Sequence, residues 1–141
     1  MRRLLVPLLI LSTVFISLGC AKTAIKNTIS DFEDAINDEY APDLLDTLSP
    51  DSDFILSDPD ATGFLFYFQS SGYIPVNYRN LDISVDGGDA DVFSDGTYAG
   101  APTDVKFWMR KEGGLFSADW RVFRYYDNGD FSTPVWRRPR D

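Results

Sequence analysis

The spacing of hydrophobic residues changes at Pro75, and this change constrains the fold more than any other feature of the sequence. Before it, apolar residues recur every three or four positions from about Thr23, which predicts an amphipathic helix. After it, apolar and polar residues alternate, which predicts strands. Helices followed by hairpin-linked strands predict an α+β fold with N-terminal helices packed on an antiparallel sheet. The residues that carry the helical period are Ile25, Ile29, Phe32 and Ile36.

Three short elements are expected between the first helix and Pro75. Pro42 suits the first turn of a helix over 41–50, in which leucines would be buried. The run DFIL at 53–56 predicts a short strand. Asp60 and Gly72 would begin and end a third helix, although its continuous apolar run is also compatible with a buried strand. The leucines of the second helix are Leu44, Leu45 and Leu48.

Glycine-containing turns divide the second half of the chain into hairpins. The clearest is Asp86-Gly87-Gly88-Asp89, which separates two segments of alternating residues. The expected turns lie at 86–89, near 100–102, at 111–114 and at 127–130, and the expected strands lie at 81–86, from 90 onward, at 105–110 and at 118–126.

The first twenty residues, MRRLLVPLLILSTVFISLGC, have the layout of a secretory signal peptide. Arg2 and Arg3 precede an apolar stretch that is shorter than the roughly 20 residues of a membrane span. The stretch ends in Ile16-Ser17-Leu18-Gly19-Cys20, which resembles the lipobox of bacterial lipoproteins. An ordinary signal peptide that leaves an incidental free thiol is the alternative, but a lone cysteine in an oxidising compartment is better explained by acylation.

The lipobox resemblance implies cleavage before Cys20, a diacylglycerol on its sulfur and attachment of the mature chain to the lipid bilayer. Ala21 is not the aspartate associated with inner-membrane retention, which favours an outer-membrane anchor facing the periplasm. The expected parts are a signal peptide at 1–19, a lipidated tether at 20–23, an α+β domain at 24–127 and a C-terminal extension at 128–141. Such a tether would hold the domain within about 10 Å of the bilayer.

Composition excludes several classes of function. The formal net charge is −9 and becomes −11 without Arg2 and Arg3, so nucleic-acid binding is not expected. The chain has no histidine, the commonest general base and zinc ligand, and we expect no metal and no cofactor. Two aspartate clusters lack calcium-loop spacing and are expected to cap helices and form turns. These clusters are Asp51, Asp53, Asp58 and Asp60, and Asp86, Asp89, Asp91 and Asp95.

The segments FEDAINDEYAPDLLDTLSPD, DISVDGGDADVFSDGTYAG, VKFWMRKEGG and WRVFRYY together resemble the superfamily named after nuclear transport factor 2. The resemblance covers roughly residues 22–127. It implies a cone-shaped α+β barrel, in which a curved sheet wraps around a long N-terminal helix and leaves a pocket between them. Enzymes of this superfamily are isomerases and dehydratases that use a pocket aspartate with tyrosine donors or an Asp–His pair, and this chain cannot form the pair.

Three functional hypotheses follow. We favour a non-catalytic domain that binds a small hydrophobic molecule or a peptide in the pocket. The first alternative is a protein-interaction module that uses the outer face of the sheet, which a partner, a second copy or the segment FSTPVW would cover. An Asp/Tyr isomerase or dehydratase is the less favoured alternative, and no catalytic residue is assigned. The pocket candidates are Tyr67, Tyr73, Tyr78 and Tyr98, the outer-face candidates are Trp108, Phe123 and Tyr125, and the basic C-terminal residues are Arg137, Arg138 and Arg140.

Overall fold

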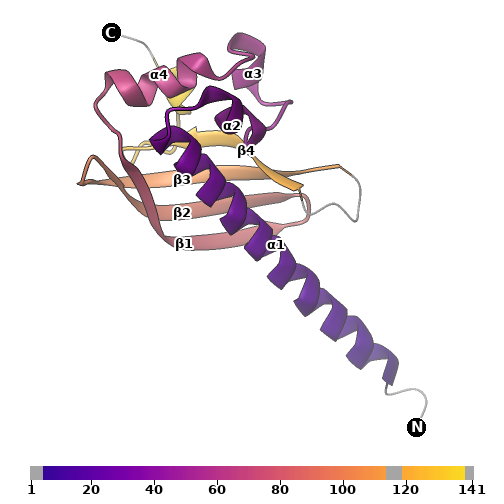
Figure 1. Cartoon of the computed structure of the whole chain (residues 1–141). Coiled ribbons are helices and arrows are strands. Elements are labelled where there is room, and N and C mark those ends of the chain that lie inside the picture. The colour runs from indigo at the N-terminus through magenta and orange to yellow at the C-terminus, as the bar shows by residue number, and fades with distance from the viewer. Residues whose placement is uncertain (1–4, 114–118, 139–141) are drawn as a thin grey trace.

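The computed structural model describes residues 5–113 and 119–138. All its α-helices precede its strands, so the α+β class is confirmed (Figure 1). The helices are α1 (Leu5–Asn37), α2 (Ala41–Asp46), α3 (Asp53–Ser57) and α4 (Thr62–Ser70), the strands are β1 (Val76–Asp86), β2 (Asp89–Tyr98), β3 (Ala101–Glu112) and β4 (Asp119–Tyr126), and a short 3₁₀ helix, η1 (Val135–Arg137), follows them.

The strands form one open antiparallel sheet in the order β1-β2-β3-β4. The predicted turn at 86–89 joins β1 to β2, and the turn near 100 joins β2 to β3. The third predicted turn, at 111–114, extends past the described residues. β1 begins at Val76, earlier than its alternation indicated, because a register shift between Arg79 and Asp82 interrupts the period of two. Closure into a cone stays a prediction of the resemblance.

α1 crosses the inner face of the sheet (Figure 1). Its four predicted core residues are each at most 2% exposed, which confirms the helical period. The ring of Phe32 lies at the centre of the core, with its centroid 5.4 Å from those of Phe107 and Tyr125. The helix starts well before Thr23 and is continuous through residues 20–23, so the expected tether is helical. Within the part of the chain that the structure describes, no helix is long and apolar enough to cross a membrane.

The predicted strand at 53–56 is wrong, because these residues belong to helix α3. A new strand would need a free sheet edge to pair with, and residues just before this segment already pair with the edge of β4. Leu48 forms a parallel bridge to Val122 there, flanked by hydrogen bonds from Ser49 N to Val122 O and from Val122 N to Thr47 O, both 2.8 Å. The segment after this bridge therefore satisfies its backbone groups within a helical turn.

The third helix is confirmed as α4, and two aspartates hold its start. Asp60 Oδ1 accepts the N–H of Thr62 at 3.1 Å, and Asp58 Oδ2 accepts the N–H of Phe64 at 3.0 Å. Both N–H groups belong to the first turn and lack a partner within the helix. Gly72 follows the end of the helix with φ of 69°, as expected for a terminating glycine.

A bulge in β4 decides which of its side chains point inward. Trp108 pairs with Arg124 and Met109 pairs with Val122, so Phe123 is an extra residue in β4 that has no pairing partner on β3. Beyond it the alternation is reversed. The prediction that Tyr125 lies on the outer face is therefore wrong, because its side chain is 0% exposed and belongs to the core.

Candidate functional site

Two of the four predicted pocket tyrosines donate to one carboxylate that the sequence did not single out, and a third joins them through Tyr125. The hydroxyls of Tyr67 and Tyr98 each donate to Asp127 Oδ2 at 2.7 Å. Tyr78 and Tyr98 both share hydrogen bonds with the hydroxyl of Tyr125, which extends the chain of polar groups into the core. Tyr78, Tyr98 and Tyr125 are each at most 9% exposed and belong to the core between α1 and the sheet.

The fourth candidate, Tyr73, stacks on this network without joining it. Its ring lies 4.3 Å from that of Tyr98 with an interplanar angle of 21°. It also forms an edge contact with Tyr67, with centroids 5.6 Å apart. Tyr73 thus covers the end of the network rather than lining an internal cavity.

Asp127 is 0% exposed, and a guanidinium balances its charge. Arg138 donates to Asp127 Oδ1, and its other N–H groups reach the backbone carbonyls of Asp127 at 3.0 Å, Asp130 at 3.2 Å and Thr133 at 3.3 Å. Asn128 Nδ2 also donates to Asp127 Oδ1, at 3.2 Å. The four donors to the carboxylate fill its usual hydrogen-bonding capacity.

Burial controls the protonation of this network. It raises the pKa of Tyr98 and Tyr67 well above the usual tyrosine value, and the neighbouring Asp127 raises the pKa of both further. Burial alone would lower the pKa of Arg138, but the hydrogen bond and charge of Asp127 outweigh it, so the pKa of Arg138 is raised. The tyrosines are therefore neutral donors and Arg138 is a cation at neutral pH.

An aromatic groove of about 350 Å³ opens beside the network, between α3, α4 and η1. Phe66 on its wall is 60% exposed, the largest exposed fraction among the large hydrophobic side chains that the structure describes. The ring of Trp136 forms the opposite wall, 5.2 Å from that of Phe54 and 5.7 Å from that of Phe64. The lining residues are Phe54, Gly63, Phe64, Phe66, Tyr67, Ser70, Ser71, Val135, Trp136 and Arg138.

Of the predicted pocket candidates, only Tyr67 lines this aromatic groove. Phe54 was assigned to a strand, Arg138 was noted only as part of a basic tail, and the segment FSTPVW was considered as a cover for the outer face of the sheet. The available signal was the apolar pair Val135-Trp136 in a mostly polar tail. Val135 is only 6% exposed in the structure. The tail also reaches the outer face at one point, where Phe131 packs on Phe93 with centroids 5.5 Å apart.

The other two outer-face candidates, Trp108 and Phe123, form a ring pair on the far side of the sheet, with centroids 5.0 Å apart. Arg110 lies over Phe123 at 4.9 Å, and Arg124 lies over Trp108 at 4.8 Å. Both rings are only partly exposed. The predicted aromatic pair therefore exists on this face, and guanidinium groups cover part of it.

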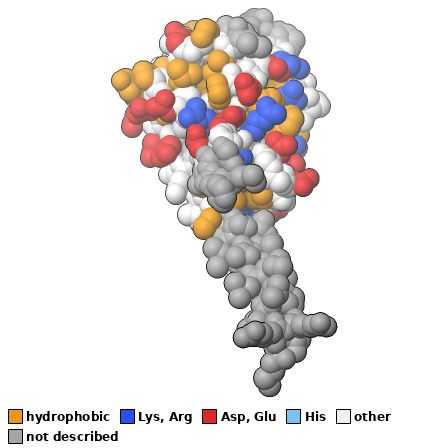
Figure 2. Space-filling view, turned by 90° about the vertical axis from the view of Figure 1, so that its right-hand side faces the viewer, with side chains coloured by type: hydrophobic (Ala, Val, Ile, Leu, Met, Phe, Trp, Pro, Cys, Tyr) orange, Lys and Arg blue, Asp and Glu red, His pale blue; other side chains and the backbone are white. Residues whose placement is uncertain are grey.

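Charge is unevenly distributed over the domain. A second groove, of about 470 Å³, lies between α1, α2 and β4 and is strongly acidic. Elsewhere the signs are mixed, and Figure 2 shows Lys and Arg side chains near the middle of one face with Asp and Glu side chains around them. Among the described residues no group of three or more acidic or cysteine side chains is arranged to hold a metal ion. The aspartates of the acidic groove are Asp31, Asp34, Asp38, Asp43, Asp46 and Asp119.

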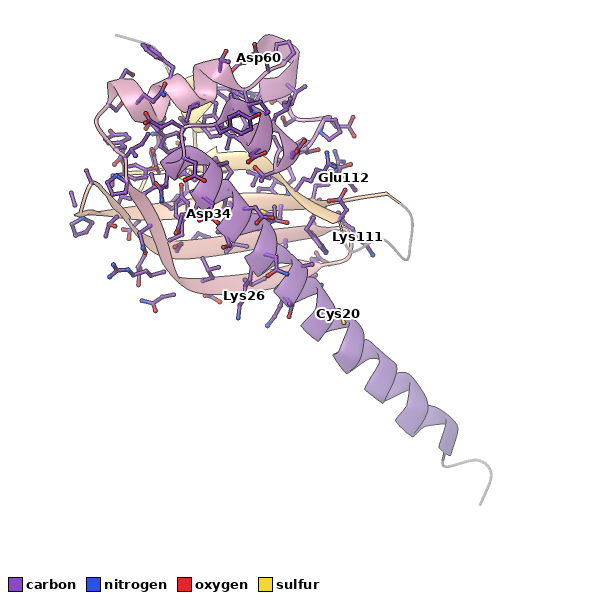
Figure 3. All side chains as sticks on the ribbon, in the orientation of Figure 1. Cys20, Lys26, Asp34, Asp60, Lys111 and Glu112 are labelled. Atoms are coloured by element: carbon purple, nitrogen blue, oxygen red, sulfur yellow. The ribbon has the colours of Figure 1, made fainter. Side chains whose placement is uncertain are left out.

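Cys20 is an exposed free thiol in this structure. It lies on the part of α1 that extends beyond the sheet, whereas Asp60, which precedes α4, lies at the opposite end of the domain (Figure 3). The aromatic groove contains α4 residues, so the predicted lipid attachment site and the groove are far apart.

No protein-family model matches this sequence, and no curated protein matches it. Among solved structures, the chain is similar to a phospholipid-binding protein from Ralstonia solanacearum in complex with a phospholipid. The two share 17% identity, and the match covers 74% of this chain and 76% of that chain with a TM-score of 0.38. A likeness this distant carries no argument about the ligand of this chain.

Proposed function

We propose that this chain is a lipid-anchored protein of the bacterial cell envelope whose domain binds an apolar group of another molecule in the aromatic groove, without chemistry on it. The observation that carries the proposal is Phe66, which stands 60% exposed on the wall of a concave aromatic site of about 350 Å³. Large apolar side chains that line a hollow and remain in water mark binding sites.

The position of Cys20 supports a binding site that faces away from the bilayer. At about 1.5 Å per helical residue, Cys20 is only about 8 Å along α1 from Ile25, the first fully buried residue of the core. An acylated Cys20 would hold that end of the domain at the membrane. The aromatic groove at the other end would then meet molecules of the periplasm rather than the anchoring lipids.

Intact-mass analysis of the protein made in a bacterial host tests the anchor. We expect the wild-type chain to lack residues 1–19 and to carry a diacylglyceryl group on Cys20. Cys20→Ser should accumulate as an unprocessed chain without lipid, because the acceptor sulfur is absent. A wild-type chain with a free thiol at Cys20 would contradict the anchor and leave the aromatic groove as a separate question.

The buried carboxylate does not favour the enzyme alternative. A catalytic base needs a free lone pair within reach of the substrate, and Asp127 is 0% exposed with four donors on its oxygens. Of the tyrosines that could polarise a substrate carbonyl, Tyr67 and Tyr98 already donate to Asp127 and Tyr78 is bonded to Tyr125. These contacts support a structural role for the network, and two of its members, Tyr67 and Arg138, also line the aromatic groove.

Fluorine NMR of protein labelled with fluorotryptophan tests the binding site, because each of the three tryptophans reports on one surface. Trp136 lines the aromatic groove, Trp120 lines the acidic groove and Trp108 lies on the outer face. Assignment comes from single Trp→Phe variants. We expect indole, a small neutral aromatic probe, to shift the Trp136 signal and to leave the Trp108 signal unchanged.

Phe66→Ser should weaken indole binding about tenfold, because it removes apolar surface from the wall of the aromatic groove. Its stability should change by no more than about 0.5 kcal/mol, since the side chain is mostly in water. The matched control is Phe93→Ser, which removes a 41% exposed phenylalanine outside the aromatic groove. Equal affinities in the two variants would refute the assignment of the site, and a shift of Trp108 alone would favour the outer-face alternative.

A further inference from the structure

The chain's own C-terminal segment, residues 131–138 (FSTPVWRR), forms one wall of the aromatic groove and covers Phe54 and Phe64, which we call the filled half. The Trp136 ring packs on Phe54 and Phe64, and Val135 beside it is 6% exposed. The segment is held in place by Arg138, which donates to Asp127 and to three backbone carbonyls. This segment is thus one example of a peptide that packs on these aromatic rings.

The next residue of the segment adds a charge to this apolar contact. Arg137 donates to the carboxylate of Asp53, the first residue of α3, and Arg124 lies 3.6 Å from the same carboxylate. Trp136 thus packs on the aromatic rings, while the next residue, Arg137, pairs with an aspartate beside them. Such a pair combines apolar burial with a charge-assisted hydrogen bond.

The rest of the groove, which we call the open half, has the same two components. Phe66, 60% exposed, and Tyr67 line it. At its rim, Gly63 lies against Asp58, since a Cβ on this glycine would come within 2.9 Å of Asp58 Oδ2.

Asp60 adds a second carboxylate close to Asp58. Burial raises the pKa of Asp58, and the neighbouring Asp60 raises it further, as expected for adjacent like charges. Among the described residues, neither aspartate forms an ion pair with a lysine or arginine, whereas Asp53 in the filled half pairs with two arginines. A cation beside the open half would relieve this repulsion.

We propose that the open half of the aromatic groove binds an aromatic side chain of a basic peptide segment from another protein, with a Lys or Arg next to it facing Asp58 and Asp60. This inference rests on the proposed function and names its partner class. The overall net charge of −9 supports it, because an acidic domain attracts cationic partners over long range.

The test uses the full chain in zwitterionic nanodiscs, labelled with fluorotryptophan, with empty nanodiscs as the blank. The probe is a synthetic copy of residues 131–138 with blocked ends, and its own tryptophan carries no fluorine. Two matched peptides replace both arginines by glutamate or the tryptophan by alanine. We expect the basic peptide to shift the Trp136 signal, the glutamate peptide to bind at least about tenfold more weakly, and the alanine peptide to cause no shift.

The variant Asp58→Asn with Asp60→Asn isolates the contribution of the carboxylates. Asparagine keeps the hydrogen bonds to the first turn of α4, so the helix should be retained. We expect the basic peptide to bind this variant about five- to tenfold more weakly while indole binding stays unchanged. Asp82→Asn with Asp86→Asn removes the same number of charges on β1 and is the matched control for net charge.

Three results would overturn the proposal. The first is equal binding of the basic and glutamate peptides, and the second is an equal effect of the two double variants on peptide binding. The third is movement of the Trp136 signal to its position in the unfolded chain, because this would mean that the peptide displaces the chain's own segment. If indole still shifts Trp136 in any of these cases, the proposed function stands and only the partner class fails. If neither indole nor the basic peptide shifts Trp136, both fail.

Discussion

Asp127→Ala is expected to lower the free energy of unfolding by about 3–5 kcal/mol. The substitution removes the acceptor for the hydroxyls of Tyr67 and Tyr98 and leaves Arg138 without its buried counterion. Tyr98 is only 4% exposed, so the loss of its acceptor leaves a buried hydroxyl without a partner, and Arg138 loses a charge-assisted hydrogen bond. Urea unfolding followed by circular dichroism measures the change.

The control for this variant is Asp104→Ala, which removes an exposed aspartate from β3. Its stability should stay within about 0.5 kcal/mol of wild type. Asp127→Asn keeps one acceptor oxygen, the amide carbonyl, and should lower the free energy of unfolding by about 2 kcal/mol. If Asp127→Ala proves no less stable than Asp104→Ala, the network does not hold the fold together, and the structural role assigned to Asp127 is refuted.

Alkaline pH is expected to unfold the domain steeply. Burial raises the pKa of Tyr78 and Tyr125 well above the usual value, and burial with the neighbouring Tyr78 and Asp127 raises that of Tyr98. In the unfolded chain these tyrosines lose their protons near pH 10. Above about pH 10 the folded state therefore binds more protons than the unfolded state, so stability falls as pH rises. Below that pH the stabilisation is fully present.

The expected slope follows from the three side chains, each no more than 9% exposed. Each contributes about 1.4 kcal/mol per pH unit, so the free energy of unfolding should fall by about 4 kcal/mol per unit once the pH is well above 10. Urea titrations at several alkaline pH values measure the slope, and ultraviolet absorbance reports tyrosinate formation. We expect cooperative ionisation that coincides with loss of circular dichroism. Gradual ionisation of all seven tyrosines in a folded chain would contradict the burial of the network.

Local pattern was sufficient for the elements whose environment is set by their own sequence. The face of α1 that packs on the sheet was predicted residue by residue, because Ile25, Ile29, Phe32 and Ile36 repeat with the helical period. The turn at 86–89 was predicted because two adjacent glycines can adopt the backbone angles that a tight hairpin turn requires. The α+β class follows from these two kinds of pattern.

The errors arose where a distant part of the chain decides the outcome. The segment 53–56 is apolar enough for a strand, but Leu48 already pairs with Val122 at the available sheet edge. Tyr125 was placed on the outer face by simple alternation, and one additional residue at the bulge, Phe123, reversed its direction. Neither the occupied sheet edge nor the bulge can be recognised from the local sequence of the segments whose structure they change.

The sequence by itself determined the fold class, the buried face of α1 and the turn at 86–89, because each depends on neighbours within a few positions, while the signal and lipidation segment stays a prediction. Only the tertiary structure decided the site. Tyr67 and Asp127 are 60 positions apart and form a hydrogen bond, and Phe54 meets Trp136 only after the tail folds back onto α3. Contacts of this kind depend on packing between distant segments, and no local period in the sequence records them.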